Sequence, residues 1–156
     1  MKSILRHPAV NAVCISLFTG AYSLIFLVTS RQKEFQEMLY YSQKATENSC
    51  SFWTAWSTFL AAGHQVYIVY ALIAITLLTI VLLSLRRRPY DEYHASILIQ
   101  CLAVAAVLTL IAIGIFYLLI LSDPNGIVEK FTLFIVIHWV TVVFSDFVYV
   151  LLCRWR

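Results

Sequence analysis

The chain has 156 residues, of which 62% are hydrophobic and 12% are charged, and its formal net charge is +3. Soluble domains are about 45–50% apolar and about 25% charged, and a domain this small leaves too much surface in water to hide the excess. The composition excludes an ordinary soluble domain, and the small net charge, without a patterned basic face, argues against a nucleic-acid partner.

Four apolar runs follow one another along the chain, at about residues 9–29, 66–85, 95–121 and 131–153. Each reaches the ~20 residues that a helix needs to cross a ~30 Å hydrocarbon core. The runs are continuous rather than alternating, which favours helices over a β-barrel. We predict an all-α integral membrane protein, with residues 1–156 forming one four-helix transmembrane bundle in the lipid bilayer.

The first run follows Lys2 and Arg6, so a secretory signal peptide is an alternative for it. However, the apolar stretch continues to Thr29, beyond the usual core of about 7–15 residues, and no A-x-A cleavage site follows it. We therefore expect an uncleaved first span.

The segment at residues 30–65 is the longest polar connection and should form the outer loop. Phe35, Met38 and Leu39 have helical spacing among charged neighbours. This pattern predicts an amphipathic extracytoplasmic segment between the first and second helices.

An aromatic cluster follows this amphipathic segment. Such rings suit the headgroup level of a membrane, where they anchor a protein, although they could also line a groove for a lipid or ligand. The sequence leaves open whether residues 51–65 extend the second helix. The aromatic residues are Phe52, Trp53, Trp56 and Phe59.

The flanking cations predict the orientation, because Lys and Arg are retained on the cytoplasmic side. Most of them lie near the two termini and at residues 86–88, whereas Arg31, Lys33, Lys44 and Lys130 lie on the other side. We expect a multi-pass protein of the cell membrane with both termini cytoplasmic. Both connectors after the second span are short, so the second and third helices, and likewise the third and fourth, should be neighbours.

The fourth run carries a stripe of polar residues. His138, Thr141 and Ser145 share one helix face, and Asp146 is one step around it. Ionisable side chains in a span avoid lipid, so we expect this stripe to face the bundle interior.

Counting from the predicted boundary places other polar groups at the depth of Asp146. Asp146 lies six residues inside Leu152, which is about 9 Å at 1.5 Å per residue. The same count from the other boundaries reaches Gln100, Cys14 and Thr79. These side chains are candidate neighbours of the aspartate.

Two interpretations of the stripe remain open. It could relay protons or cations, because histidine changes charge near neutral pH and intramembrane ionisable residues are functional candidates. Alternatively, it could hold helices together through hydrogen bonds of about 0.6–2 kcal/mol each.

Catalytic and metal-binding patterns are absent from the sequence. The fourth run has one acid, and the chain has no C-x-x-C, H-E-x-x-H, G-x-S-x-G or phosphate-binding loop. We therefore assign no catalytic residue, no metal site and no cofactor. Cys50 is expected to lie outside, away from the other three cysteines, either as a free thiol or joining two subunits.

Three classes of function fit these features. The preferred hypothesis is a small membrane protein that acts by contact, as an accessory or regulatory subunit or an immunity-type protein, with a membrane-protein partner or as a homo-oligomer. The alternative is a small oligomeric transporter or channel that uses the stripe of the fourth helix. A membrane-embedded enzyme acting on lipid is the third.

Overall fold

The structure is a computed structural model that describes residues 7–46, 51–85 and 91–154. These residues form six α-helices and no strand, which confirms the all-helical prediction. Four of the helices are long and apolar enough to cross a membrane. The helices are α1 (Pro8–Arg31), α2 (Lys33–Thr46), α3 (Ser51–Ala61), α4 (Gln65–Ser84), α5 (Glu92–Ser122) and α6 (Ile127–Arg154).

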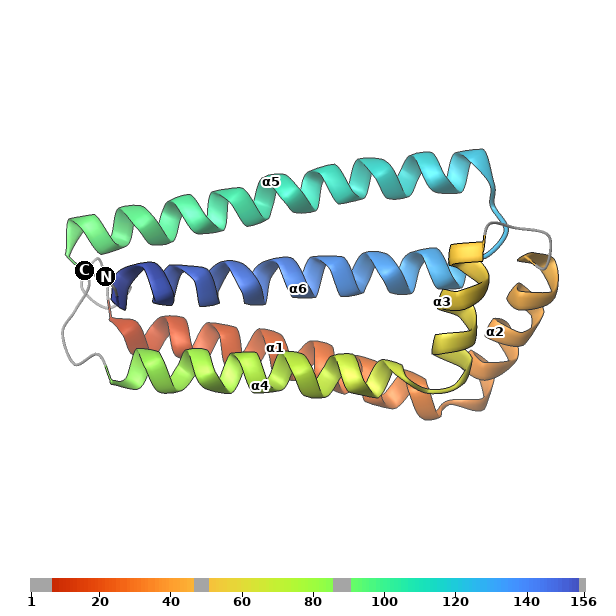
Figure 1. Ribbon diagram of the computed structural model, residues 1–156, viewed down its shortest axis with the longest axis horizontal. Coiled ribbons are helices and arrows are strands. Elements are labelled where there is room, and N and C mark those ends of the chain that lie inside the picture. The colour runs from red at the N-terminus through yellow and green to blue at the C-terminus, as the bar shows by residue number, and fades with distance from the viewer. Residues whose placement is uncertain (1–6, 47–50, 86–90, 155–156) are drawn as a thin grey trace.

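The four long helices run side by side, and α1 begins at the same end of the molecule at which α6 ends (Figure 1). Three of them, α1, α4 and α6, pack on one another around a common apolar core. The largest side chain of this core, Trp139 of α6, is completely buried and lies against Tyr22 and Phe26 of α1. The other buried members of the core are Ile15, Val69, Leu72 and Val143.

The fourth long helix, α5, lies at the edge of this group and packs mainly on α6 (Figure 1). The expectation that the second and third spans, α4 and α5, pack side by side is therefore wrong, because these helices share at most a minor contact, whereas the expected pairing of α5 with α6 is confirmed. A short connector limits how far apart two helices can lie but does not require them to pack. Here α6 fills the position beside α4 that α5 would have taken.

The two short helices, α2 and α3, lie across one end of the long helices, and we call them the cap (Figure 1). On α2, Leu39 is completely buried while Lys33 and Glu34 are exposed, as expected of an amphipathic helix. The chain turns at Gly63, whose φ of 72° suits a residue without a side chain. This turn separates α3 from α4, so residues 51–65 do not extend the second long helix.

Specific residues fix the helix ends. Pro8 begins α1, where its missing N–H costs nothing, and the Asp91 carboxylate accepts a 2.9 Å hydrogen bond from the His94 amide at the start of α5. Between α5 and α6, Gly126 adopts a φ of 68° and helps to form the short connector expected from the sequence.

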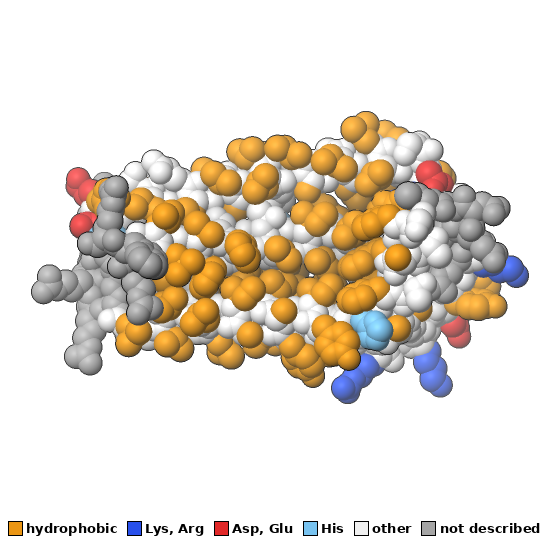
Figure 2. Space-filling model, viewed as in Figure 1, with side chains coloured by type: hydrophobic (Ala, Val, Ile, Leu, Met, Phe, Trp, Pro, Cys, Tyr) orange, Lys and Arg blue, Asp and Glu red, His pale blue; other side chains and the backbone are white. Residues whose placement is uncertain are grey.

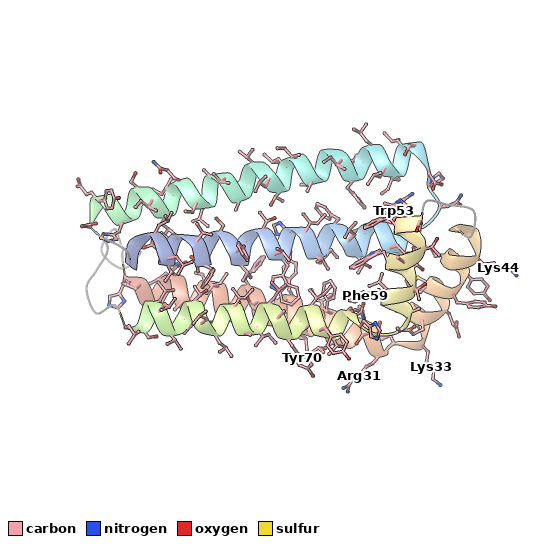
Figure 3. All side chains as sticks on the ribbon, viewed as in Figure 1. Arg31, Lys33, Lys44, Trp53, Phe59 and Tyr70 are labelled. Carbon is pink, nitrogen blue, oxygen red and sulfur yellow. The ribbon has the colours of Figure 1, made fainter. Side chains whose placement is uncertain are left out.

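Charged side chains lie at the two ends of the face in Figure 2, and hydrophobic side chains cover the length between them. Among the cations, Arg31, Lys33 and Lys44 lie at the cap end (Figure 3). Large exposed apolar side chains lie on α1, α4, α5 and α6, for example Leu17, Leu77 and Leu118.

Candidate functional site

The aspartate of α6 is buried beside an asparagine of α1. Asp146 is 2% exposed, and its Oδ1 accepts a 2.7 Å hydrogen bond from Nδ2 of Asn11. Its second oxygen, Oδ2, is also buried and has no hydrogen-bond partner among the described residues. The site is thus a buried carboxyl group in which one oxygen accepts from the neutral Asn11 amide and the other oxygen, Oδ2, is left without a donor in the part of the chain that the structure describes.

The histidine of α6 lies where three helices meet. Its Nδ1 is 3.1 Å from the hydroxyl oxygen of Thr109 on α5, and its ring is 5.8 Å and 5.9 Å from the rings of Phe18 and Tyr22 on α1. His138 therefore joins α6 to α5 and contacts α1, whereas Asp146 joins α6 to α1. No hydrogen bond among the described residues links these two ionisable groups.

The two hydroxyl groups of the stripe also form hydrogen bonds. Ser145 donates a 2.6 Å hydrogen bond to the backbone oxygen of Cys101, which forms a second polar contact between α6 and α5. Thr141 donates to the backbone oxygen of Ile137 in its own helix, at 2.7 Å. Consequently, three of the four stripe residues hold α6 to another helix.

The other residues of the predicted layer lie in separate environments. Thr79 is buried but donates to the backbone oxygen of Ile75 in its own helix. Cys14 and Gln100 are exposed, and Gln100 forms no hydrogen bond with another described residue. None of the three donates a hydrogen bond to Asp146. A depth count places a residue along the helix axis but does not give the direction of its side chain.

A shallow groove follows α5 and α6. It consists of two cavities of about 480 Å³ and 270 Å³ that share Leu108 and Thr141. Gln100 and Ser145 line the first cavity, and Trp53 and Lys130 line the second. From Lys130 to Val148 the groove follows α6 for about 27 Å, at 1.5 Å per residue.

The predicted aromatic cluster belongs to α3, in the cap (Figure 3). Trp56 and Phe59 stack with ring centroids 5.5 Å apart, and the indole N–H of Trp56 donates a 3.0 Å hydrogen bond to the backbone oxygen of Glu129. Phe52 is exposed, whereas Trp53 is half-buried near the Lys130 ammonium. Trp56 thus attaches the cap to the start of α6.

A buried acid completes this attachment. Glu129 is 1% exposed, and its two carboxylate oxygens accept hydrogen bonds from Ser42 of α2 at 2.5 Å and from Ser57 of α3 at 3.1 Å. The acid also lies in the first turn of α6, where a helix favours negative charge. One side chain therefore holds both helices of the cap.

The neighbouring cation, Lys130, is also buried and closes the loop between α5 and α6. Its ammonium donates to the backbone oxygen of Asn125 at 2.7 Å, and to the backbone oxygen and the carboxylate of Asp123. The pKa of Asp123 is lowered from its ordinary value, first by the hydrogen bond from the Asn125 backbone N–H and then by Lys130. Loss of solvent around the carboxylate opposes this effect.

Metal ligation has little support in this arrangement. No three His, Cys, Asp or Glu side chains within residues 7–46, 51–85 and 91–154 form a group that could hold a metal ion. The two interpretations of Cys50, a free thiol or a link between subunits, lie outside the described residues, as does the cation cluster at residues 86–88.

Sequence reasoning missed Asn11, Thr109 and Glu129. The first two are uncharged polar residues within apolar runs, and their scarcity there is a signal that they have partners. Glu129 gave a weaker signal, because an acid next to a predicted boundary normally faces water. Its burial results from the cap folding over that boundary.

Comparison of the chain with protein-family models, curated proteins and solved structures gives no match.

Proposed function

We propose that the chain is a multi-pass protein of the cell membrane, in which α1, α4, α5 and α6 cross the bilayer. Their length and their apolar surface support this placement. The excess of Lys and Arg near the two termini and at residues 86–88 supports a cytoplasmic location for both termini, with the cap on the outer side.

Accessibility of single cysteines to a membrane-impermeant maleimide tests this topology. In a background with the four native cysteines replaced by serine, Lys44→Cys should react in intact cells. Glu92→Cys should react only after the cells are opened. Equal labelling of both positions in intact cells would reject the orientation, and recovery of the protein from the membrane by alkaline washing would reject the insertion.

We further infer that the protein acts by contact with another membrane-embedded helix. The observation that carries this proposal is the exposure of α5, in which Ala105 is the one buried residue along the whole helix. A helix attached to its own chain along one side offers the others to a partner or to lipid.

The use of polar groups in α6 also supports a contact function. His138, Ser145 and Asp146 are engaged with Thr109, the Cys101 backbone and Asn11, respectively. This is the adhesive use of polar groups between membrane helices. With these polar groups of α6 engaged inside the chain, α5 is the long helix that offers the most exposed surface to a partner.

Photo-crosslinking in native membranes tests the contact function. A photoreactive residue at Leu110 of α5 should give protein adducts, and one at Leu77 of α4 should give mainly lipid adducts, because both positions are exposed but only the first is on α5. Lipid adducts alone from both positions would count against a function by contact.

Proton-coupled or cation-coupled transport is the second candidate, favoured by the vacant acceptor Oδ2 of Asp146. Measurement of proton or cation flux into proteoliposomes tests this candidate in the parent protein and in the variants Asp146→Asn and His138→Ala. A flux that falls only in Asp146→Asn would assign the pathway to the carboxyl group. Absence of flux in the parent protein would remove this candidate.

A further inference from the structure

Two features of α5 have no explanation among the residues that the structure describes. Gln100 is exposed and forms no hydrogen bond with another described residue, although its carboxamide can donate two hydrogen bonds and accept two. Gly114 lies inside the helix, where glycine costs about 1 kcal/mol relative to alanine, yet a Cβ at this position would meet no atom within 4 Å. Nothing in the part of the chain that the structure describes requires a carboxamide or a glycine at these positions.

The two residues lie on one face of α5. They are fourteen residues apart, which is two heptads, and Val107 is midway between them. Together with Val104, Ile111 and Leu118 they follow the alternating spacing of four and three that a left-handed helix pair uses. We call these six residues the α5 seam, and all of them are exposed or half-buried.

We propose that the α5 seam is the interface of a parallel homodimer, in which α5 of a second copy packs on α5 of the first. This inference rests on the proposed function and names the partner as the chain itself. Two copies inserted with the same topology are related by a twofold axis along the membrane normal. Each seam residue therefore faces the same residue of the second copy at the same depth in the membrane.

The chemistry of the two unexplained residues fits this symmetry. A carboxamide carries both a donor and an acceptor, so two Gln100 side chains can exchange N–H···O=C hydrogen bonds without charge repulsion. Gly114 brings two backbones close together, as small residues do between membrane helices. The side of α5 that contacts α6, at Ala105 and Thr109, is left unchanged.

A second copy explains more than the other occupants of this face. A lipid tail would cover the apolar seam residues but would leave the Gln100 carboxamide without a partner in hydrocarbon, where unpaired polar groups are costly. An unrelated helix would need a polar residue at the matching depth. A second copy always supplies such a residue, because its own Gln100 lies at the same depth.

The test is the association of full-length protein in liposomes, measured by energy transfer between two fluorescent labels as the lipid is diluted. The parent should be dimeric, and Gln100→Leu should weaken association roughly 3- to 30-fold, which corresponds to the loss of interhelical hydrogen bonds. Gly114→Leu should abolish the energy transfer, because a bulky side chain keeps the backbones apart. Unchanged circular dichroism verifies that each variant is folded.

Gly20→Leu is the matched control. Gly20 is likewise an exposed glycine inside a long helix, α1, and a Cβ added there would meet no atom within 4 Å. It should leave the dimer intact. Equal loss of energy transfer in both glycine variants would overturn the assignment of the interface, and a parent that is monomeric at every lipid ratio would overturn the dimer.

Photo-crosslinking at Ile111 separates failure of this inference from failure of the proposed function. An adduct of twice the chain mass supports the homodimer. An adduct with a different membrane protein alone rejects the homodimer but retains a function by contact. Lipid adducts alone reject both.

Discussion

The side-chain amide of Asn11 donates a 2.7 Å hydrogen bond to the carboxylate of Asp146, joining α1 to α6 near the end where α1 begins and α6 ends. The two residues are 135 positions apart in the chain. The carboxylate is 2% exposed and its other oxygen has no hydrogen-bond partner among the described residues, so this amide is its principal support.

This relationship predicts a non-additive pair of substitutions. Asn11→Leu leaves a buried carboxyl group without a donor, and Asp146→Leu leaves an amide without an acceptor. Each should lower the free energy of unfolding by about 1–3 kcal/mol, whereas the double variant should lose less than the sum, because replacing both partners by apolar groups is often nearly neutral. Reversible unfolding in bicelles measures the cycle. Additive losses would show that the two side chains are not coupled.

The buried Glu129 predicts a selective loosening of the cap. Glu129→Ala removes the acceptor of Ser42 and Ser57 and should cost about 1–3 kcal/mol of local stability. Hydrogen exchange should accelerate in α2 and α3 while α1, α4 and α6 stay protected, since the core does not include this residue.

Glu37→Ala is the matched control for the cap, because Glu37 is an exposed acid on α2. It should leave exchange unchanged. Loss of protection in the cap and the core together after Glu129→Ala would contradict a local role for the buried acid.

The positions of the long helices could be predicted from the sequence because burial in a membrane depends mainly on apolar length. The predicted run at residues 66–85 compares with Gln65–Ser84 in the structure, and the run at residues 95–121 with Glu92–Ser122. The earlier start of α5 comes from the Asp91 carboxylate, which caps the His94 amide. Such caps lie outside an apolar run, so hydropathy alone does not reveal them.

The partners of the polar side chains could be predicted only in part. Counting from the boundary placed Cys14 of α1 at the depth of Asp146 and so selected it as a neighbour. In the structure, Asn11 of the same helix forms the hydrogen bond instead. Depth fixes the position of a residue along the helix axis, but the rotation of the helix is set by packing. The position of α5 away from α4 is likewise a property of packing that connector length does not determine.

The attachment of α5 to α6 includes two polar contacts in addition to apolar packing, such as that of Phe116 on Phe134, so removal of the polar contacts should loosen this helix. A variant that combines Thr109→Val with Ser145→Ala loses the contacts to His138 and to the Cys101 backbone. Distances between spin labels at Leu110 on α5 and Leu77 on α4 should become more broadly distributed. Ser84→Ala, which removes a hydroxyl bonded only within α4, is the control and should leave the distribution narrow. Equal broadening in this control would contradict the prediction.

The loop between α5 and α6 should lose stability in acid because of Asp123. Hydrogen bonding from the Asn125 backbone N–H, with help from Lys130, lowers the pKa of Asp123 in the folded protein. A carboxyl group with a lowered pKa stabilises the fold above its unfolded pKa of about 3.9, and this stabilisation is lost as the pH falls through the folded value.

Carbon NMR of the Asp123 carboxyl group, titrated in nanodiscs, measures this pKa directly. In Lys130→Met the pKa should rise but stay below its ordinary value, because the Asn125 N–H remains and is the larger influence. In Asp123→Asn, the part of the acid-induced loss that comes from this loop should disappear, because the amide does not titrate in this range. A parent protein in which Asp123 titrates at or above its ordinary pKa would contradict the loop geometry, since an accepted N–H bond and a nearby ammonium both favour the charged form.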